Sequence, residues 1–97
     1  MKLDPKVKAK WVKALKSGKY QKTSAGHLKY KGRFCCLGVA CEIGLATPVK
    51  VVGIPYYVNS DFLPHLIQID LATMNDGSNY QKGLSLRKIA DWIQENL

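Results

Sequence analysis

A nearly uncharged run of thirteen residues, 34–46, constrains the fold more than any other stretch of this chain. The run is too short to cross a lipid bilayer, which takes about 20 apolar residues. Its apolar side chains recur at helical spacing, and a glycine inside a helix, such as Gly38, often marks the close approach of another backbone. We therefore expect a strand to end at residues 33–35 and a buried central helix to follow over about residues 36–44.

The first and last helices are predicted with defined ends. Asp4 followed by proline is typical of a helix start, and Gly18 is typical of a helix end. The segment between them carries an apolar stripe that includes Trp11, so we expect Trp11 in the core and the lysines in solvent. Ser85 is expected to cap the last helix, whose apolar positions are regularly spaced.

The middle of the second half is predicted to hold two short helices. One covers residues 63–69, and Asp70 caps a second one over residues 71–76. Before them, β-branched and aromatic residues predict strands over residues 49–52 and 54–58.

A first pair of strands is expected over residues 19–22 and 27–30, followed by a tight turn at Lys31-Gly32. The inward-facing side chains of this small sheet are expected to be Tyr20, Leu28, Tyr30 and Phe34. The whole chain, residues 1–97, is therefore predicted to be a single compact α+β domain, with a small antiparallel sheet packed with about four helices.

The charge of the chain is concentrated in its first third. Residues 1–33 carry a net charge of +10 and residues 34–97 a net charge of −2, giving +8 in total. A basic segment on a nearly neutral body is typical of proteins that bind nucleic acid, nucleotides or an acidic protein. The alternative is a solvated lysine face that only keeps the protein soluble. We expect no membrane partner.

Five residues are predicted to bind an anionic ligand. Lys29, Lys31 and Arg33 crowd the tight turn, and an arginine there can hold a phosphate bidentately or remain a surface side chain without a ligand. Tyr57 is a candidate for stacking on a base. Asn75 is expected either to read a base edge or to cap helix carbonyls.

The three cysteines predict reduced thiols rather than a disulfide or a metal site. Their spacing is not that of a zinc site, and two of them are adjacent, so we expect no metal, no cofactor and a reducing compartment. Cys35 near a helix start is a candidate nucleophile, with His27 or His65 as its base. Its apolar neighbours instead predict an inert core thiol, and we assign no catalytic residue.

Two blocks of the sequence carry a family resemblance. Residues 34–42, FCCLGVACE, resemble an F-C-C-L-G-V-x-C-[DE] signature, and residues 71–77, LATMNDG, followed by IADWI at 89–93, resemble its partner block. Together with WVKALKSGKY at 11–20, they are similar to small uncharacterised proteins of tailed phages and prophages.

This resemblance implies a phage product made in the cytoplasm of a bacterial host, but no catalytic residue. It implies a non-enzymatic accessory protein that binds a nucleotide immune signal or nucleic acid, and it is compatible with an anti-defence role and with assembly into a homo-oligomer. The alternatives are a protein–protein inhibitor of a host factor, docking on an acidic surface, and a small cysteine-dependent enzyme that uses Cys35.

Overall fold

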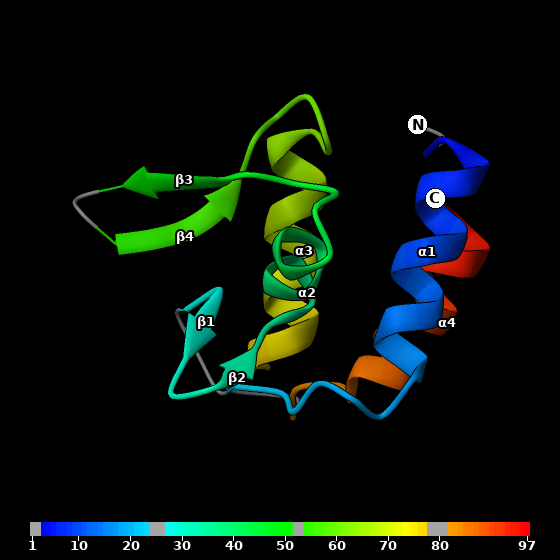
Figure 1. The fold of residues 1–97 in the computed structure, drawn as a ribbon, viewed down its shortest axis with the longest axis horizontal. Helices are drawn as coiled ribbons and strands as arrows, with labels where there is room; N and C mark the ends of the chain where they lie inside the picture. Colours follow the sequence, from blue (N-terminus) through cyan, green and yellow to red (C-terminus); the bar gives the residue numbers. More distant parts are fainter. Residues whose placement is uncertain (1–2, 24–26, 52–53, 78–81) are drawn as a thin grey trace.

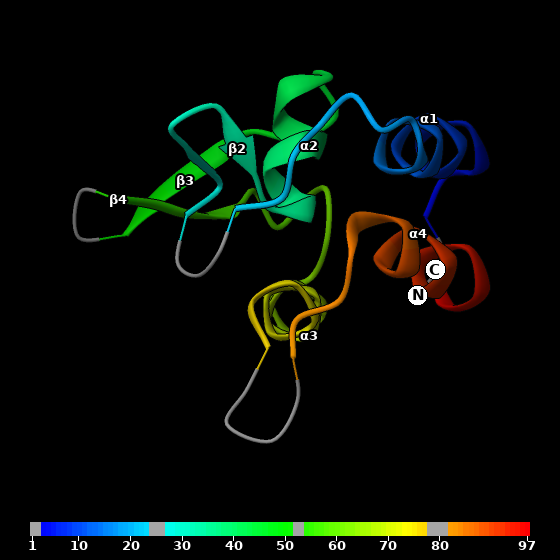
Figure 2. The ribbon, with the colours of Figure 1, turned by 90° about the horizontal axis from the view of Figure 1, so that it is seen from below.

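The structure is a computed structural model that describes residues 3–23, 27–51, 54–77 and 82–97. Its elements follow in the order α1 (Pro5–Lys16), β1 (Lys29–Tyr30), β2 (Arg33–Phe34), α2 (Cys36–Glu42), β3 (Pro48–Val51), β4 (Ile54–Val58), α3 (His65–Asp76) and α4 (Leu86–Asn96). In Figures 1 and 2, α1 and α4 lie side by side at one end, α2 and α3 lie at the centre, and the strands lie at the other end. The α+β class predicted from the sequence is confirmed.

The caps predicted at the starts of the first and last helices are present. The Asp4 carboxylate accepts hydrogen bonds from the backbone N–H groups of Lys6 and Val7 at 2.8 and 3.3 Å. Ser85 accepts one from the N–H of Lys88 at 3.2 Å at the start of α4. Both caps satisfy amides that an α-helix leaves without an internal partner at its first turn.

The central helix α2 is held by groups from both neighbouring helices. The buried Trp11 indole on α1 donates to the Cys36 carbonyl at 2.9 Å. From α3, the Asn75 side-chain oxygen accepts from the Cys36 N–H at 3.3 Å. Cys35 caps α2, and its sulfur accepts from the N–H of Gly38 at 3.3 Å. The apolar run therefore is the centre of the core, as the sequence predicts.

The predicted sheet is two separate two-stranded antiparallel sheets. One pairs β1 with β2, and the other pairs β3 with β4 with an irregularity between Val49 and Lys50. The expected strand over residues 19–22 is reduced to an isolated parallel bridge between Lys22 and Phe34. Gly53, where the sequence predicts a turn between the strands over residues 49–52 and 54–58, lies outside the described residues.

The two short helices predicted around Asp70 are one continuous helix, α3. Pro64 occupies its N-cap position, and Asp70 is an exposed residue in its middle. The buried Gln68 anchors the first turns of this helix. Its amide accepts from the Val58 N–H at 2.9 Å and donates to the carbonyls of Val58 and Leu63 at 3.0 and 2.8 Å, which ties the first turns of α3 to the end of β4.

Candidate ligand-binding hairpin

The β1–β2 hairpin carries the three cations predicted to bind phosphate, around a turn that needs a left-handed backbone. Lys31 and Gly32 both have positive φ, 51° and 77°, which is typical of the tight turns that join two antiparallel strands. Lys29 pairs with Phe34 and Tyr30 pairs with Arg33. Since paired residues share a face and neighbours alternate, Lys29 lies on one face of the hairpin and Arg33 on the other.

The outer face of the hairpin, formed by His27, Tyr30, Lys31 and Arg33, presents an aromatic ring among cations. Tyr30 is 48% exposed and stacks on the His27 ring, with centroids 4.8 Å apart and planes 18° apart. The Lys31 ammonium lies 5.4 Å from the centre of the Tyr30 ring. The part of the Tyr30 ring that His27 and Lys31 leave open can meet a flat ring, and the cations can meet an adjacent negative charge.

Tyr30 was expected to face inward, and this prediction is wrong. The alternation that places Leu28 inside does not continue, because β1 begins only at Lys29. Tyr30 is instead paired with the exposed Arg33 and turned to solvent. The signal available in the sequence was the Lys31-Gly32 turn, since counting back from it pairs Tyr30 with a charged residue.

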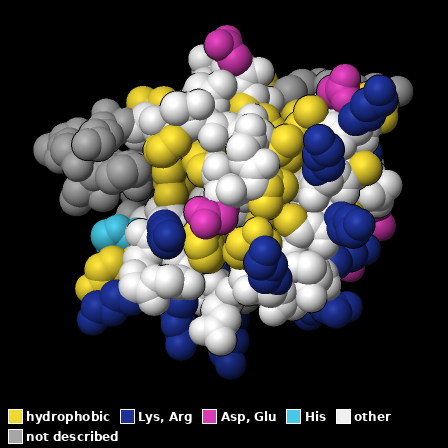
Figure 3. Space-filling view, viewed as in Figure 1, with side chains coloured by type: hydrophobic (Ala, Val, Ile, Leu, Met, Phe, Trp, Pro, Cys, Tyr) yellow, Lys and Arg dark blue, Asp and Glu magenta, His cyan; other side chains and the backbone are white. Residues whose placement is uncertain are grey.

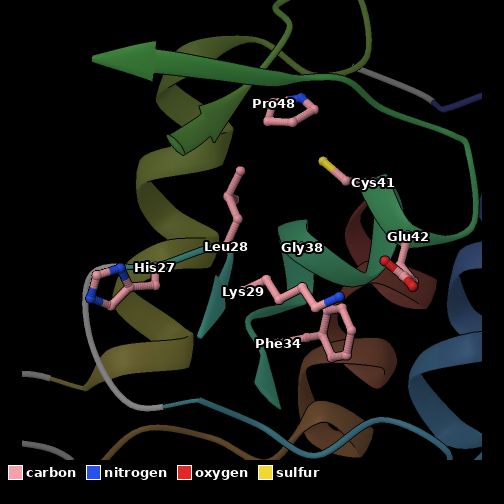
Figure 4. A pocket seen from close by; sticks show the side chains of 8 residues that line it. All are labelled: His27, Leu28, Lys29, Phe34, Gly38, Cys41, Glu42 and Pro48. Carbon is pink, nitrogen blue, oxygen red and sulfur yellow. The ribbon is translucent and has the colours of Figure 1, made fainter. Parts of the chain in front are cut away.

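The inner face of the hairpin carries Lys29 and borders a pocket. The Lys29 ammonium lies 5.2 Å from the centre of the Phe34 ring. A pocket of about 340 Å³ opens beside it, between this hairpin, α2 and the start of β3, as Figure 4 shows. The three predicted cations therefore share one hairpin but not one face.

Two other predicted ligand residues, Tyr57 and Asn75, lie away from the outer face. Tyr57 on β4 is half-buried and meets the His65 ring edge-on, with centroids 4.7 Å apart. Asn75 is 1% exposed, and its amide accepts from the Cys36 N–H and donates to the Thr23 carbonyl, both at 3.3 Å. The structure thus engages the Asn75 amide with the backbone of other segments, rather than with the carbonyls of its own helix.

Lys22 makes an interaction that the sequence did not predict. Its ammonium donates to the backbone carbonyls of Asn75 and Leu84 at 2.8 and 2.9 Å, at the end of α3 and just before α4. A cation at the C-terminus of a helix also complements the helix dipole. Lys22 is therefore occupied within the fold, and no local pattern in the sequence distinguishes it from the exposed lysines.

The positive charge of α1 lies on a separate surface from the hairpin. Lys6, Lys10, Lys13 and Lys16 are exposed on this helix, and Lys16 forms an ion pair with Asp91 at 2.8 Å. Figure 3 shows Lys and Arg side chains along the lower and right-hand edges of one face, with apolar side chains between them. Cations on α1 therefore provide a matched comparison for the cations of the hairpin.

The thiols do not have the environment of a cysteine nucleophile. Burial raises the pKa of Cys35 to about 11 from an ordinary value of 9.0, despite hydrogen bonds from the Gly38 and Leu37 amides that lower it. Burial also raises the pKa of Cys41 to about 11 and that of Cys36 well above its ordinary value. The alternative that Cys35 is favoured as a thiolate is contradicted, because burial outweighs the helix start.

These thiols predict a loss of stability at alkaline pH. The folded chain holds the Cys35 and Cys41 protons to a higher pH than the unfolded chain. The contribution of these thiols to the free energy of unfolding is therefore complete below about pH 9 and is lost as the pH rises through about 11. Urea unfolding at about pH 8 and about pH 10.5 measures this loss. A Cys41→Ala variant should lose less stability between the two pH values than the parent chain, and an equal or larger loss would contradict the assignment.

Two kinds of feature are absent from the described residues. No helix in the described ranges is long and apolar enough to cross a bilayer. Within the same ranges, no group of three or more His, Cys, Asp or Glu side chains could hold a metal ion.

The comparisons with known proteins find similarity to one family. No match is found among curated proteins or among solved structures. A family model described as a domain of unknown function, DUF8296, matches residues 3–50, the segment that holds α1, the β1–β2 hairpin and α2. Over this segment the chain is similar to that family, whose description names no activity.

Proposed function

We propose that this chain is a non-enzymatic binding protein for a phosphate-bearing ligand, a nucleotide or nucleic acid, held on the outer face of the β1–β2 hairpin. The observation that supports the proposal is the exposed Tyr30 ring between the cations of Lys31 and Arg33. A base stacks on the ring, and its phosphate pairs with a neighbouring cation.

The energies of these contacts favour the outer face over a surface that carries lysines without an exposed aromatic ring. Stacking of one base on an aromatic side chain contributes about 1–3 kcal/mol, whereas an isolated surface ion pair contributes about 0–1 kcal/mol. Among the described residues, the hairpin combines cations with an exposed ring, whereas the exposed lysines of α1 surround no exposed aromatic ring and the Tyr20 ring beside Lys19 is half-buried. The proposal extends to a phage protein that binds a host immune-signal nucleotide or nucleic acid, in keeping with the sequence resemblance.

Removal of the hairpin cations should weaken binding of a single-stranded nucleic acid. The probe is a fluorescein-labelled single-stranded DNA oligonucleotide, followed by anisotropy at low and at physiological salt. We expect Lys31→Ala/Arg33→Ala to weaken binding about tenfold or more and to reduce its salt dependence. Tyr30→Leu should weaken binding by about fivefold or more with its salt dependence unchanged.

The matched control removes the same charge from another surface. Lys10→Ala/Lys13→Ala on α1 carries two fewer cations, as the hairpin variant does, and should bind the oligonucleotide nearly as the parent chain does. Equal losses in the two double variants would show that only net charge matters. Undiminished binding in the hairpin variant would remove the outer face from consideration.

A host protein is a second candidate partner, favoured by exposed apolar residues on α3. Leu66 is 76% exposed and Ile69 is 38% exposed, and their spacing places them on one side of the helix. If this surface binds a partner, a protein captured from bacterial lysate by the parent chain should be lost with Leu66→Asp and retained with Lys31→Ala/Arg33→Ala. The opposite result would assign the captured protein to the hairpin.

A further inference from the structure

The pocket on the inner face of the hairpin has an apolar interior and a charged mouth. Leu28, Phe34, Cys41 and Pro48 supply apolar walls, and Lys29 and Glu42 supply the charges; His27, which also stacks on Tyr30, and Gly38 complete the lining. In Figure 4 the Leu28 side chain and the Cys41 sulfur project into the space beneath Pro48. Its volume of about 340 Å³ is at the lower end of the range for small-molecule sites.

The mouth of the pocket carries two opposite charges that are not used to pair with each other. Figure 4 shows the Lys29 ammonium directed toward the side of the pocket where the Glu42 carboxylate lies. Among the described residues, the one ion pair within 4.0 Å joins Lys16 to Asp91. The Phe34 ring, 5.2 Å from the Lys29 ammonium, holds that cation at the pocket.

The Glu42 carboxylate is open to a ligand at the mouth of the pocket. Glu42 is the last residue of α2, where the helix dipole disfavours a negative charge. It is exposed, and it forms no ion pair within 4.0 Å with another described residue. A positively charged group that enters the pocket can therefore reach this carboxylate without displacing an ion pair of the fold.

We propose that the pocket binds a free α-amino acid with an apolar side chain. The ligand's ammonium donates to the Glu42 carboxylate, its carboxylate accepts from the Lys29 ammonium, and its side chain fills the space between Leu28 and Cys41. An α-amino acid carries its two charges on adjacent atoms, and this matches two opposite charges at one mouth. Its apolar body matches the walls.

The same charges argue against a nucleotide in this pocket. A phosphate placed at Lys29 would meet the Glu42 carboxylate at the same mouth, and two negative groups repel each other. The outer face has no acidic side chain among its four members. The amino-acid site therefore goes beyond the proposed nucleotide site, and either one can be wrong without the other.

The test is a titration of the ¹⁵N-labelled full chain with L-leucine, L-methionine and L-phenylalanine, followed by amide chemical shifts. At least one of them should produce saturable shifts centred on Gly38, Cys41 and Glu42, with a dissociation constant of roughly millimolar order, since both charges are solvent-exposed. The N-acetyl derivative, which lacks the ammonium, and the amide derivative, which lacks the carboxylate, should each bind about tenfold more weakly.

Protein variants assign the two charges separately. Glu42→Gln should weaken binding of the amino acid about tenfold, and the N-acetyl derivative should then bind as well as the free amino acid. Lys29→Gln should also weaken binding about tenfold, and the amide derivative should then bind as well as the free amino acid. Glu95→Gln and Lys13→Gln, exposed residues on α4 and α1, are the matched controls and should leave binding unchanged. Cys41→Phe should abolish binding by filling the pocket.

Three outcomes would overturn this assignment. The first is the absence of saturable shifts with all three amino acids. The second is equal binding of the parent amino acid and its N-acetyl derivative to the unaltered chain, a result that does not depend on any variant folding. The third is a stronger response of the same amides to guanosine monophosphate, which would place a nucleotide in the pocket instead. None of these results bears on oligonucleotide binding at Tyr30.

Discussion

The Gly38→Ala variant is expected to be destabilised by about 2 kcal/mol or more, although alanine is the better helix former. Helix propensity alone favours the substitution by about 1 kcal/mol. However, a Cβ at this position would collide with the Leu28 backbone carbonyl, and neither group can rotate away. The same carbonyl accepts a hydrogen bond from the Cys35 N–H at 3.1 Å, so the segment entering the hairpin would have to move from α2. Overpacking of this kind typically costs about 1–3 kcal/mol, and here it must also exceed the gain in propensity.

Urea unfolding followed by tryptophan fluorescence measures this effect, with Gly18→Ala as the comparison. Gly18 has a φ of 77°, and an added Cβ would meet no atom within 4 Å, so its substitution costs only backbone strain of about 1 kcal/mol. The expected order of stability is parent chain, Gly18→Ala, Gly38→Ala. If Gly38→Ala were as stable as the parent chain, α2 would not pack on Leu28 as closely as described.

The Asn75→Ala variant is expected to lose about 3 kcal/mol of unfolding free energy. The substitution leaves the Cys36 N–H and the Thr23 carbonyl without the partner that Asn75 provides, and an unsatisfied buried group costs about 1–3 kcal/mol. Because the native stability of a small domain is about 5–15 kcal/mol, much of the total would be lost. Thermal and urea unfolding measure the change.

Thr73→Ala, two residues earlier on α3, is the control for Asn75→Ala. Thr73 is exposed and bonds only the carbonyl of Ile69 in its own helix at 2.9 Å, so its substitution should be nearly neutral. The pair also tests the predicted ligand role of Asn75. An Asn75→Ala protein with parental stability and weakened oligonucleotide binding would identify a base reader, whereas reduced stability with unchanged affinity of the folded fraction identifies a structural amide.

Local signals in the sequence predicted α1, α4 and the tight turn. Asp4 and Ser85 act over two or three residues, and the Trp11 stripe repeats within one helix, so each can be recognised without knowledge of the fold. The expectation that another backbone approaches Gly38 closely is also confirmed.

Contacts between distant segments could not be predicted in this way. Asn75 and Cys36 are 39 positions apart, and Lys22 and Asn75 are 53 positions apart. Asp70 was predicted to cap a helix because an aspartate side chain suits a cap position. The hydrogen bonds of Gln68 to β4 instead anchor the first turns of one continuous helix, and Asp70 lies in its middle. The pocket charges arise from the same cause, since Lys29 and Glu42 are brought together only by the packing of the hairpin on α2.

The contacts of α1 and α2 also limit how the family similarity over residues 3–50 can be interpreted. Within that segment α1 and α2 are consecutive helices, yet α1 packs along α4, and the first amide of α2 is satisfied by Asn75. Residues outside the segment therefore complete its core. A stretch of shared sequence need not be a module that folds alone, and a relative that keeps only residues 3–50 would need a different partner to cover Trp11 and Leu15.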